Sequence, residues 1–249
     1  MAKTQERKRA SARKAAQERA RRRERQRLIR SVVALVVVAG VVAAFAVARG
    51  GGGTSRSTSP TTPQTDIATA TVTGTPGPEG IPLQEGDVLA PPTTAATGKT
   101  VDGVQCQASE QVAYHVHTHL AVFVNGVLRP IPAGIGIVQP VPQQTPNGPF
   151  YAANTCYYWL HVHAQDGVIH VESPSVKNYT LGQFFALWGQ PLSTSAVGAA
   201  SGPLTVFVDG RPYTGDPAMI TLASHRDVQI DVGTPVVPPE KVLWPANGL

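Results

Sequence analysis

Six histidines of this 249-residue chain lie in two short segments, and five of them are at alternate positions. The segments are HVHTHL, with His115, His117 and His119, and WLHVHAQDGVIHVES, with His161, His163 and His170. Residues i, i+2 and i+4 of a β-strand point to the same face. This spacing therefore places His115, His117 and His119 on one side of a strand, and likewise His161 and His163. Imidazole is a ligand of zinc, copper, iron and nickel, and the pattern therefore indicates metal chemistry.

The second segment predicts a β-hairpin. Asp166-Gly167 is typical of a two-residue type I′ loop, which would pair His163 with His170 and His161 with Glu172. All four side chains would then share one face, with opposed Cβ atoms about 5 Å apart. A four-residue loop changes these pairs but keeps the same faces, whereas a loop of three or five residues would break the arrangement.

The candidate metal ligands are therefore the histidines of both segments and one carboxylate: His115, His117, His119, His161, His163, His170 and Glu172. Zinc and copper are the favoured metals, with iron and nickel still open. Two other interpretations are a hydrogen-bonded or solvated polar face and a proton-sensing cluster whose imidazoles charge together on acidification. Whether the two segments form one site or two depends on a strand order that the sequence does not reveal. We expect His225, the remaining histidine, to be structural.

Three classes of function fit these ligands. The leading hypothesis is a module that captures, transfers or senses a metal ion, because no catalytic partner is evident. A hydrolase, hydratase or oxidase with a three-histidine metal is the second, and Glu172 would then be the general base. The third is an envelope interaction protein whose histidines are incidental. The sequence contains no Gly-rich phosphate loop, GxSxG, HExxH or CxxC motif.

The charge of the chain is strongly asymmetric. Of the 21 Lys and Arg residues, 13 lie in residues 1–30 with three acidic residues, so this segment carries +10. The rest has eight basic and 13 acidic residues, a net charge of −5. Nucleic-acid binding by the C-terminal part is not expected, because that part lacks a basic patch.

An apolar run follows the basic segment. Residues 31–48 are 18 residues without a charge, and as a helix they would span roughly 27 Å, close to the thickness of a bilayer core. Since positive residues stay on the cytoplasmic side, we expect a single-pass membrane anchor with the N-terminus inside and the C-terminal domain outside. The alternative is a cleaved signal peptide ending near Ala46-Val47-Ala48, although the apolar run is longer than usual for one. Both alternatives place the remainder outside the cytoplasm.

Composition divides the chain into four parts. Residues 1–30 are expected to be a basic cytoplasmic segment, residues 31–48 the transmembrane helix, and residues 49–100 a disordered Gly/Ser/Thr/Pro linker. Residues 101–249 form the expected extracytoplasmic domain. Its two cysteines, Cys106 and Cys156, are expected to pair in an oxidising compartment.

The domain is expected to be mainly β, as a sandwich-like or barrel-like fold with one short helix. Asn125-Gly126 and Asp209-Gly210 each follow an alternating apolar run and predict hairpins. Thr180 and Gln183 have the spacing of a capping box, which predicts a helix that ends before Gly189. AVFVNG (121–126) resembles TVFVDG (205–210), so the domain is either an internal duplication or contains similar strand-turn pieces that arose independently.

Overall fold

The computed structural model describes residues 68–92, 96–246 and 249, all within the compact unit Gln64–Leu249. The predicted basic segment, the predicted transmembrane helix (31–48) and the first part of the predicted linker lie outside the described residues. In the part of the chain that is described, no helix is long and apolar enough to cross a membrane.

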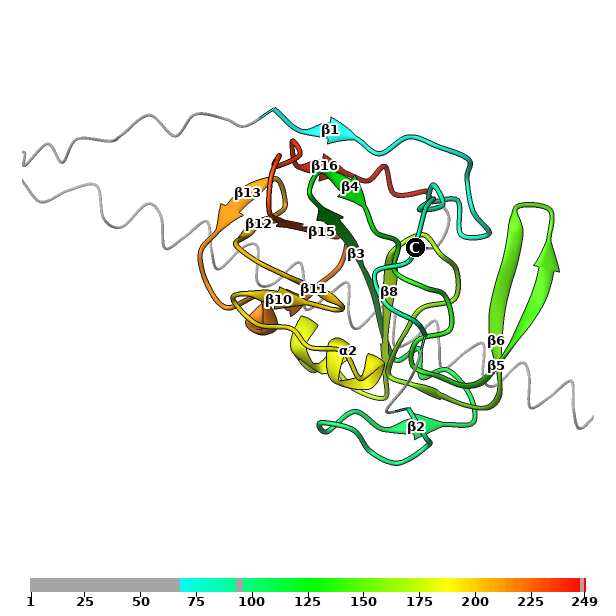
Figure 1. Cartoon of the computed structure of the whole chain (residues 1–249). Helices are drawn as coiled ribbons and strands as arrows, with labels where there is room; N and C mark the ends of the chain where they lie inside the picture. Colours follow the sequence, from blue (N-terminus) through cyan, green and yellow to red (C-terminus); the bar gives the residue numbers. More distant parts are fainter. Residues whose placement is uncertain (1–67, 93–95, 247–248) are drawn as a thin grey trace, which may run out of the picture. The chain divides into compact units, whose positions relative to one another are not determined.

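The described chain is mainly β with a single α-helix (Figure 1). The strands of the first half are β1 (Ala70–Thr71), β2 (Cys106–Gln107), β3 (Tyr114–Val124), β4 (Val127–Leu128), β5 (Ile137–Thr145), β6 (Gly148–Tyr158), β7 (Leu160–His161) and β8 (Val168–Ser173). The second half contains β9 (Tyr179–Thr180), α2 (Leu181–Trp188), β10 (Ala196–Val197), β11 (Ala200–Ser201), β12 (Leu204–Val208), β13 (Arg211–Tyr213), the 3₁₀ helix η1 (Pro217–Met219), β14 (Thr221–Leu222), β15 (Arg226–Val232) and β16 (Glu240–Lys241). The expectation of a mainly β domain with one short helix is confirmed.

The central sheet has the strand order β13-β12-β15-β3-β8-β7, with β4 also paired to β3. β15 runs parallel to β3, and the other neighbouring strands are antiparallel. A smaller sheet, β2-β6-β5, includes the long β5–β6 hairpin that projects from the domain in Figure 1. No sheet among the described residues closes into a barrel, so the barrel-like alternative is not what the chain adopts.

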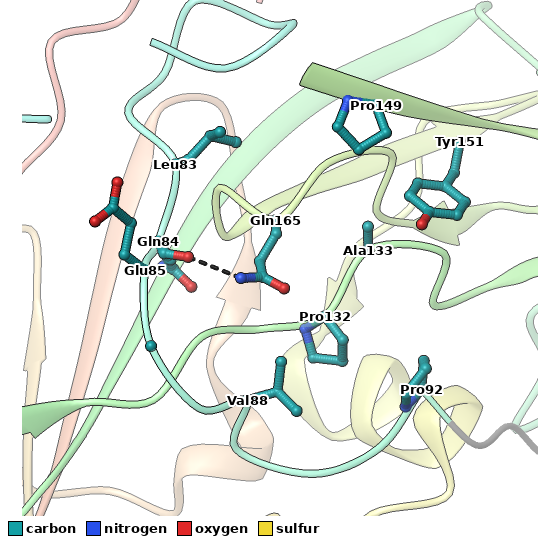
Figure 2. Close-up of a pocket in the computed structure, with 11 residues that line it drawn as sticks. Leu83, Gln84, Glu85, Val88, Pro92, Pro132, Ala133, Pro149, Tyr151 and Gln165 are labelled. Atoms are coloured by element: carbon teal, nitrogen blue, oxygen red, sulfur yellow. Dashed lines mark hydrogen bonds between the residues drawn. The ribbon is translucent and has the colours of Figure 1, made fainter. Parts of the chain in front are cut away.

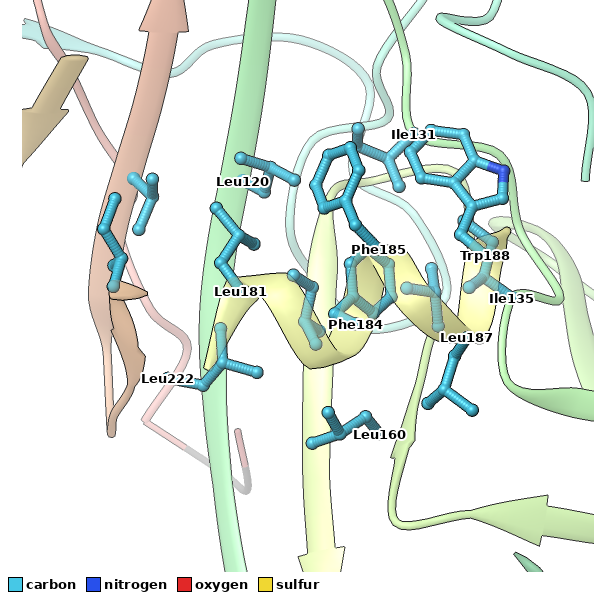
Figure 3. Close-up of a cluster of buried hydrophobic side chains, with 14 of the residues drawn as sticks. Leu120, Ile131, Ile135, Leu160, Leu181, Phe184, Phe185, Leu187, Trp188 and Leu222 are labelled. Atoms are coloured by element: carbon cyan, nitrogen blue, oxygen red, sulfur yellow. The ribbon is translucent and has the colours of Figure 1, made fainter. Parts of the chain in front are cut away.

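Helix α2 covers one face of the central sheet. Thr180 is the N-cap, and its side chain and that of Gln183 form the predicted capping box; Gly189 ends the helix with a left-handed φ of 71°. The buried side chains of α2 are Leu181, Phe184, Phe185, Leu187 and Trp188. They pack with Leu120 of β3 and Leu160 of β7 in the main hydrophobic core (Figure 3). The apolar residues of the strands therefore face α2, and the alternate residues face away from it.

Two of the three predicted tight turns are confirmed. Asn125 and Gly126 have φ angles of 51° and 77°, and Asp209 and Gly210 have 52° and 75°, as a type I′ turn requires. The first turn connects β3 to β4 and the second connects β12 to β13. The internal duplication stays a prediction. β8 lies antiparallel to β3 of the first hairpin, and β15 lies antiparallel to β12 of the second, but β8 pairs only with residues 114–119 of β3.

The third predicted turn, at Asp166-Gly167, does not have the backbone conformation of a type I′ turn. Only Gly167 has a positive φ, and the Asp166 carboxylate accepts a hydrogen bond from the Val168 amide. His161 pairs with His170, so the predicted two-residue register is wrong and the register is that of the four-residue loop. The reason is tertiary: after His161 the chain leaves β8, and its backbone bonds to residues 134–135 and 151 instead.

The domain also begins earlier than residue 101, where composition placed its start. Within residues 68–92, β1 pairs with β16, and Ile81 and Leu89 are buried. Ile81 packs with Val168 and Val242 on the face of the sheet opposite α2. Isolated apolar residues between prolines and glycines have no periodicity, so this packing had no sequence signal.

Cys106 and Cys156 form the predicted disulfide, with 50 residues of sequence separation. The bond connects β2 to β6 next to the point where these two strands pair. It therefore fixes the base of the β5–β6 hairpin against the segment that precedes β3.

Gly136 fixes the position of β7, and its replacement by alanine is expected to be costly. Its φ is +72°, and an added Cβ would overlap the Leu160 carbonyl oxygen and lie 3.0 Å from the His161 Cα. We expect Gly136→Ala to lower the free energy of unfolding of the full-length chain by more than about 2 kcal/mol in urea denaturation. Gly103 is the matched control, because its φ is +75° but its nearest neighbour would be 3.9 Å away. An equal loss for both alanine variants would contradict close packing at Gly136.

Candidate metal centre

The predicted ligands meet on the face of the central sheet that α2 leaves uncovered. β8 lies between β3 and β7, and its His170 is directly opposite His117 of β3 and His161 of β7. His115 of β3 is opposite Glu172 of β8. Two segments about 50 residues apart in sequence therefore place imidazoles in one row across three neighbouring strands.

The alternation of β8 explains why its polar residues face this row. Ile169 and Val171 belong to the main hydrophobic core, so His170 and Glu172 must point to the opposite face. All six residues of β8 are buried, including these two polar ones. The strand is covered on both faces, and its polar side chains must find partners within the protein.

Six of the seven predicted ligands fall into two sets of four, which share His170 and Glu172. The inner set consists of His161, His163, His170 and Glu172. The outer set consists of His115, His117, His170 and Glu172. Within each set, one ligand atom from every residue lies within 4.8 Å of the others, so each set could hold one metal ion.

Backbone carbonyls orient two imidazoles of the inner set. His161 Nδ1 lies 2.8 Å from the Tyr158 carbonyl oxygen, and His163 Nδ1 lies 2.7 Å from that of Tyr151. A carbonyl only accepts, so each Nδ1 carries the proton and donates it. Each neutral ring then presents a bare Nε2, and these two atoms lie 3.0 Å apart. When both rings are neutral, no proton lies between these two nitrogens, and their lone pairs face each other in a buried site.

His170 is oriented by a carboxylate from outside the central sheet. Its Nε2 lies 2.7 Å from Glu79 Oε1, and both side chains are buried. Its Nδ1 faces the centre, 3.1 Å from His117 Nε2 and 3.4 Å from Glu172 Oε1. A carboxylate on the remote nitrogen of an imidazole is a common arrangement around metal-binding histidines, since it fixes the ring and increases its basicity.

Burial keeps most of these imidazoles neutral. Loss of solvation, followed by repulsion from His170, lowers the pKa of His161 to about 4. Burial and the neighbouring His161 and His170 lower the pKa of His163 to about 2. The pKa of His117 is also lowered to about 2, first by burial and then by His170. Neutral imidazole is the form that binds a metal ion.

His170 and Glu172 behave oppositely. Burial acts to lower the pKa of His170, but the attraction of Glu79 and the hydrogen bonds to Glu172 and Glu79 outweigh it and raise that pKa to about 10. Burial acts to raise the pKa of Glu172, but hydrogen bonds from His115 and His170 hold it well below its usual range. In the metal-free chain, a proton on His170 is thus the positive charge between two buried carboxylates.

The structure places the other two histidines outside both sets. His119 is buried on the same face of β3, but it pairs with Val168 rather than with a polar residue, and its Nε2 has no partner. Its ring instead hydrogen-bonds the Asp166 backbone. His225 is exposed, stacks on Trp244 and contacts the Leu249 carbonyl oxygen.

Two carboxylates at the centre were not predicted. Glu79 comes from the segment taken as linker, where a turn over residues 77–81 and the buried Ile81 hold it over β8. Glu110, which precedes β3, lies 3.5 Å from His163 Nε2 and is partly exposed. A glutamate in a Pro/Gly-rich stretch carries no signal of its contacts, so only folding reveals these two.

A separate pocket has a volume of about 610 Å³ (Figure 2). It is mostly apolar, and its lining includes Leu83, Val88, Pro132, Pro149, Tyr151 and Gln165. None of the inner or outer set residues lines it. Tyr151 lines the pocket, and its carbonyl oxygen accepts the His163 hydrogen bond.

No protein-family model, curated protein or solved structure matches this chain. The chemistry of the centre is therefore the basis for a functional assignment.

The tautomers and pKa values can be measured by NMR. In the metal-free full-length protein, we expect ¹H–¹⁵N spectra to show His161 and His163 protonated at Nδ1 and uncharged down to about pH 4. In the unfolded chain these two rings take up a proton near pH 6.5. The free energy of unfolding is therefore highest above pH 6.5 and falls as the pH is lowered toward 4, by about 1.4 kcal/mol per pH unit for each ring. Protonation of either ring near pH 6.5 in the folded protein would contradict this.

Proposed function

We propose that this protein binds a transition-metal ion, zinc or copper, at the inner set, for metal capture, transfer or sensing. The observation that carries the proposal is the contact between the bare Nε2 atoms of His161 and His163. At 3.0 Å, two lone pairs repel unless a cation lies between them. Two imidazoles on a tetrahedral zinc ion have nitrogens roughly 3.3 Å apart, so a small shift would accommodate the ion.

The rest of the inner set supports the same assignment. His170 offers Nδ1 and Glu172 offers a carboxylate, so the set has three nitrogen ligands and one oxygen ligand. Zinc and copper(II) both accept this combination. The hydrogen bonds of the three rings to Tyr158, Tyr151 and Glu79 hold them in place before an ion arrives, which reduces the entropy lost on binding.

Metal titration tests this proposal. We expect the full-length protein, stripped of metal by dialysis, to bind Zn²⁺ or Cu²⁺ with a micromolar or lower Kd in isothermal titration calorimetry. Removal of one group that hydrogen-bonds a metal ligand lowers the affinity of a metal site about 10-fold to 100-fold. Loss of two ligands in His161→Ala/His163→Ala should therefore weaken binding by at least about 100-fold. His225→Ala is the control and should bind as the wild type does. Absence of binding by the wild type, or equal binding by the double variant, would refute the proposal.

We further propose that the domain works outside the cytoplasm, anchored to the membrane by residues 31–48. The support is the basic segment before the apolar run, together with the Cys106–Cys156 disulfide, which is typical of an oxidising compartment. Metal capture at the cell surface or metal delivery to an envelope protein fits this location.

Labelling of intact cells tests the orientation. Val176 is 78% exposed, so Val176→Cys provides an accessible thiol on the domain. A membrane-impermeant maleimide should label this variant in intact cells. It should label Ala12→Cys, in the basic segment, only after lysis. The reverse pattern, or labelling of neither before lysis, would contradict the proposed orientation.

A further inference from the structure

The outer pair of imidazoles, His115 and His117, would not be ligands of a single ion bound at the inner set. Both lie on β3, whereas His161 and His163 follow β6 on the other side of β8. Adjacent strands are about 4.8 Å apart, so the backbones of His117 and His161 are separated by roughly 10 Å with His170 between them. The two pairs therefore approach the shared residues from opposite sides.

One ion does not reach both pairs. Ligands on opposite sides of a zinc or copper ion, each at about 2.1 Å, lie at most about 4.2 Å apart. The imidazoles fall instead into two separate groups of close ligand atoms, each completed by His170 and Glu172. His117 Nε2 lies 3.1 Å from His170 Nδ1 on one side, and the His161–His163 contact of 3.0 Å lies on the other.

Glu172 is the residue suited to serve both groups. The Nε2 of His170 is bonded to Glu79, so His170 can bind only one ion, through Nδ1 after that nitrogen releases its proton. Glu172 has two oxygens. Oε1 lies 2.9 Å from His115 Nε2 and 3.4 Å from His170 Nδ1, whereas Oε2 is buried and has no hydrogen-bond partner among the described residues. A metal ion would give this second oxygen a partner, while Oε1 keeps its contacts with the two imidazoles.

We propose that the centre holds two transition-metal ions bridged by the Glu172 carboxylate. One ion is bound by His161, His163 and His170, and the second by His115 and His117. This inference rests on the proposed function, because it adds a second ion to the same site. Carboxylate-bridged ions in two-metal sites are typically about 3.5–4 Å apart.

The two positions differ in access and rigidity. Every residue of the inner set is buried, and its three imidazoles are held by hydrogen bonds from their remote nitrogens. His115 has a side chain that is 33% exposed, so the outer position is open to solvent. The inner ion is therefore the tighter one, and the outer position is where an ion enters, leaves or passes to a partner.

Stoichiometry tests the second position. Metal-free full-length protein is equilibrated with excess Zn²⁺, separated from free metal and measured by elemental analysis. We expect two ions per chain in the wild type and in His225→Ala, which controls for ions at surface histidines. We expect one ion per chain in His115→Ala/His117→Ala, with the tighter Kd changed by less than about 3-fold. The reverse double variant, His161→Ala/His163→Ala, should lose the tighter ion.

X-ray absorption of the wild type loaded with two equivalents of Zn²⁺ gives a readout that does not depend on any variant folding. We expect a zinc–zinc distance of about 3.5–4 Å, lost in Glu172→Gln. Three results would each overturn the two-ion centre while leaving single-ion binding intact. They are saturation of the wild type at one ion, the absence of a zinc–zinc distance, and loss of both ions in the His115→Ala/His117→Ala variant. Binding of no ion at all would instead refute the proposed function.

Discussion

The burial of β8 on both faces is the constraint on which the rest of this domain depends. One face carries Ile169 and Val171, which join the core under α2. The other carries His170 and Glu172, which are equally inaccessible to water. Polar groups removed from water need hydrogen-bond or charged partners within the protein. Here the partners are imidazoles and carboxylates from both neighbouring strands and from residues 77–81, the covering segment.

This compensation is incomplete in the protein alone. Glu172 Oε2 and Glu79 Oε2 are buried without a donor, and the bare nitrogens of His161 and His163 face each other. A fold that needed only a stable interior would gain from apolar residues at these positions, because well-packed hydrophobic replacements for buried charges are often neutral or stabilising. This arrangement therefore supports the proposed metal ion, which would satisfy these groups.

The covering segment connects the centre to the region near the N-terminal end of the domain. Ile81 anchors residues 77–81 against Val168 and Val242, and the same short turn delivers Glu79 to His170. The packing of this segment on the sheet therefore also positions the carboxylate that orients the His170 ring. A chain without the segment would expose Val168 and leave the His170 ring without its carboxylate partner.

The sequence by itself determined the local features. Alternation identified the strands and the faces on which the histidines lie, Asn125-Gly126 and Asp209-Gly210 identified two turns, and the capping box identified α2; each depends on residues close in sequence. The expected oxidising compartment and the presence of two cysteines indicated the Cys106–Cys156 disulfide. The seven candidate ligands included the six that come together, because residue type and period-2 spacing are properties of single strands.

Only the tertiary structure decided how these strands meet. It placed β8 between β3 and β7, which turned two histidine segments into one centre, and it left His119 beside Val168. It also set the register of His161 against His170, since the backbone after β7 bonds to residues 134–135 and 151 rather than to β8. Glu79 and Glu110 were likewise contributed by packing. Strand order and long-range contacts depend on the balance of all burial and hydrogen bonding in the domain, and no short stretch of sequence carries that information.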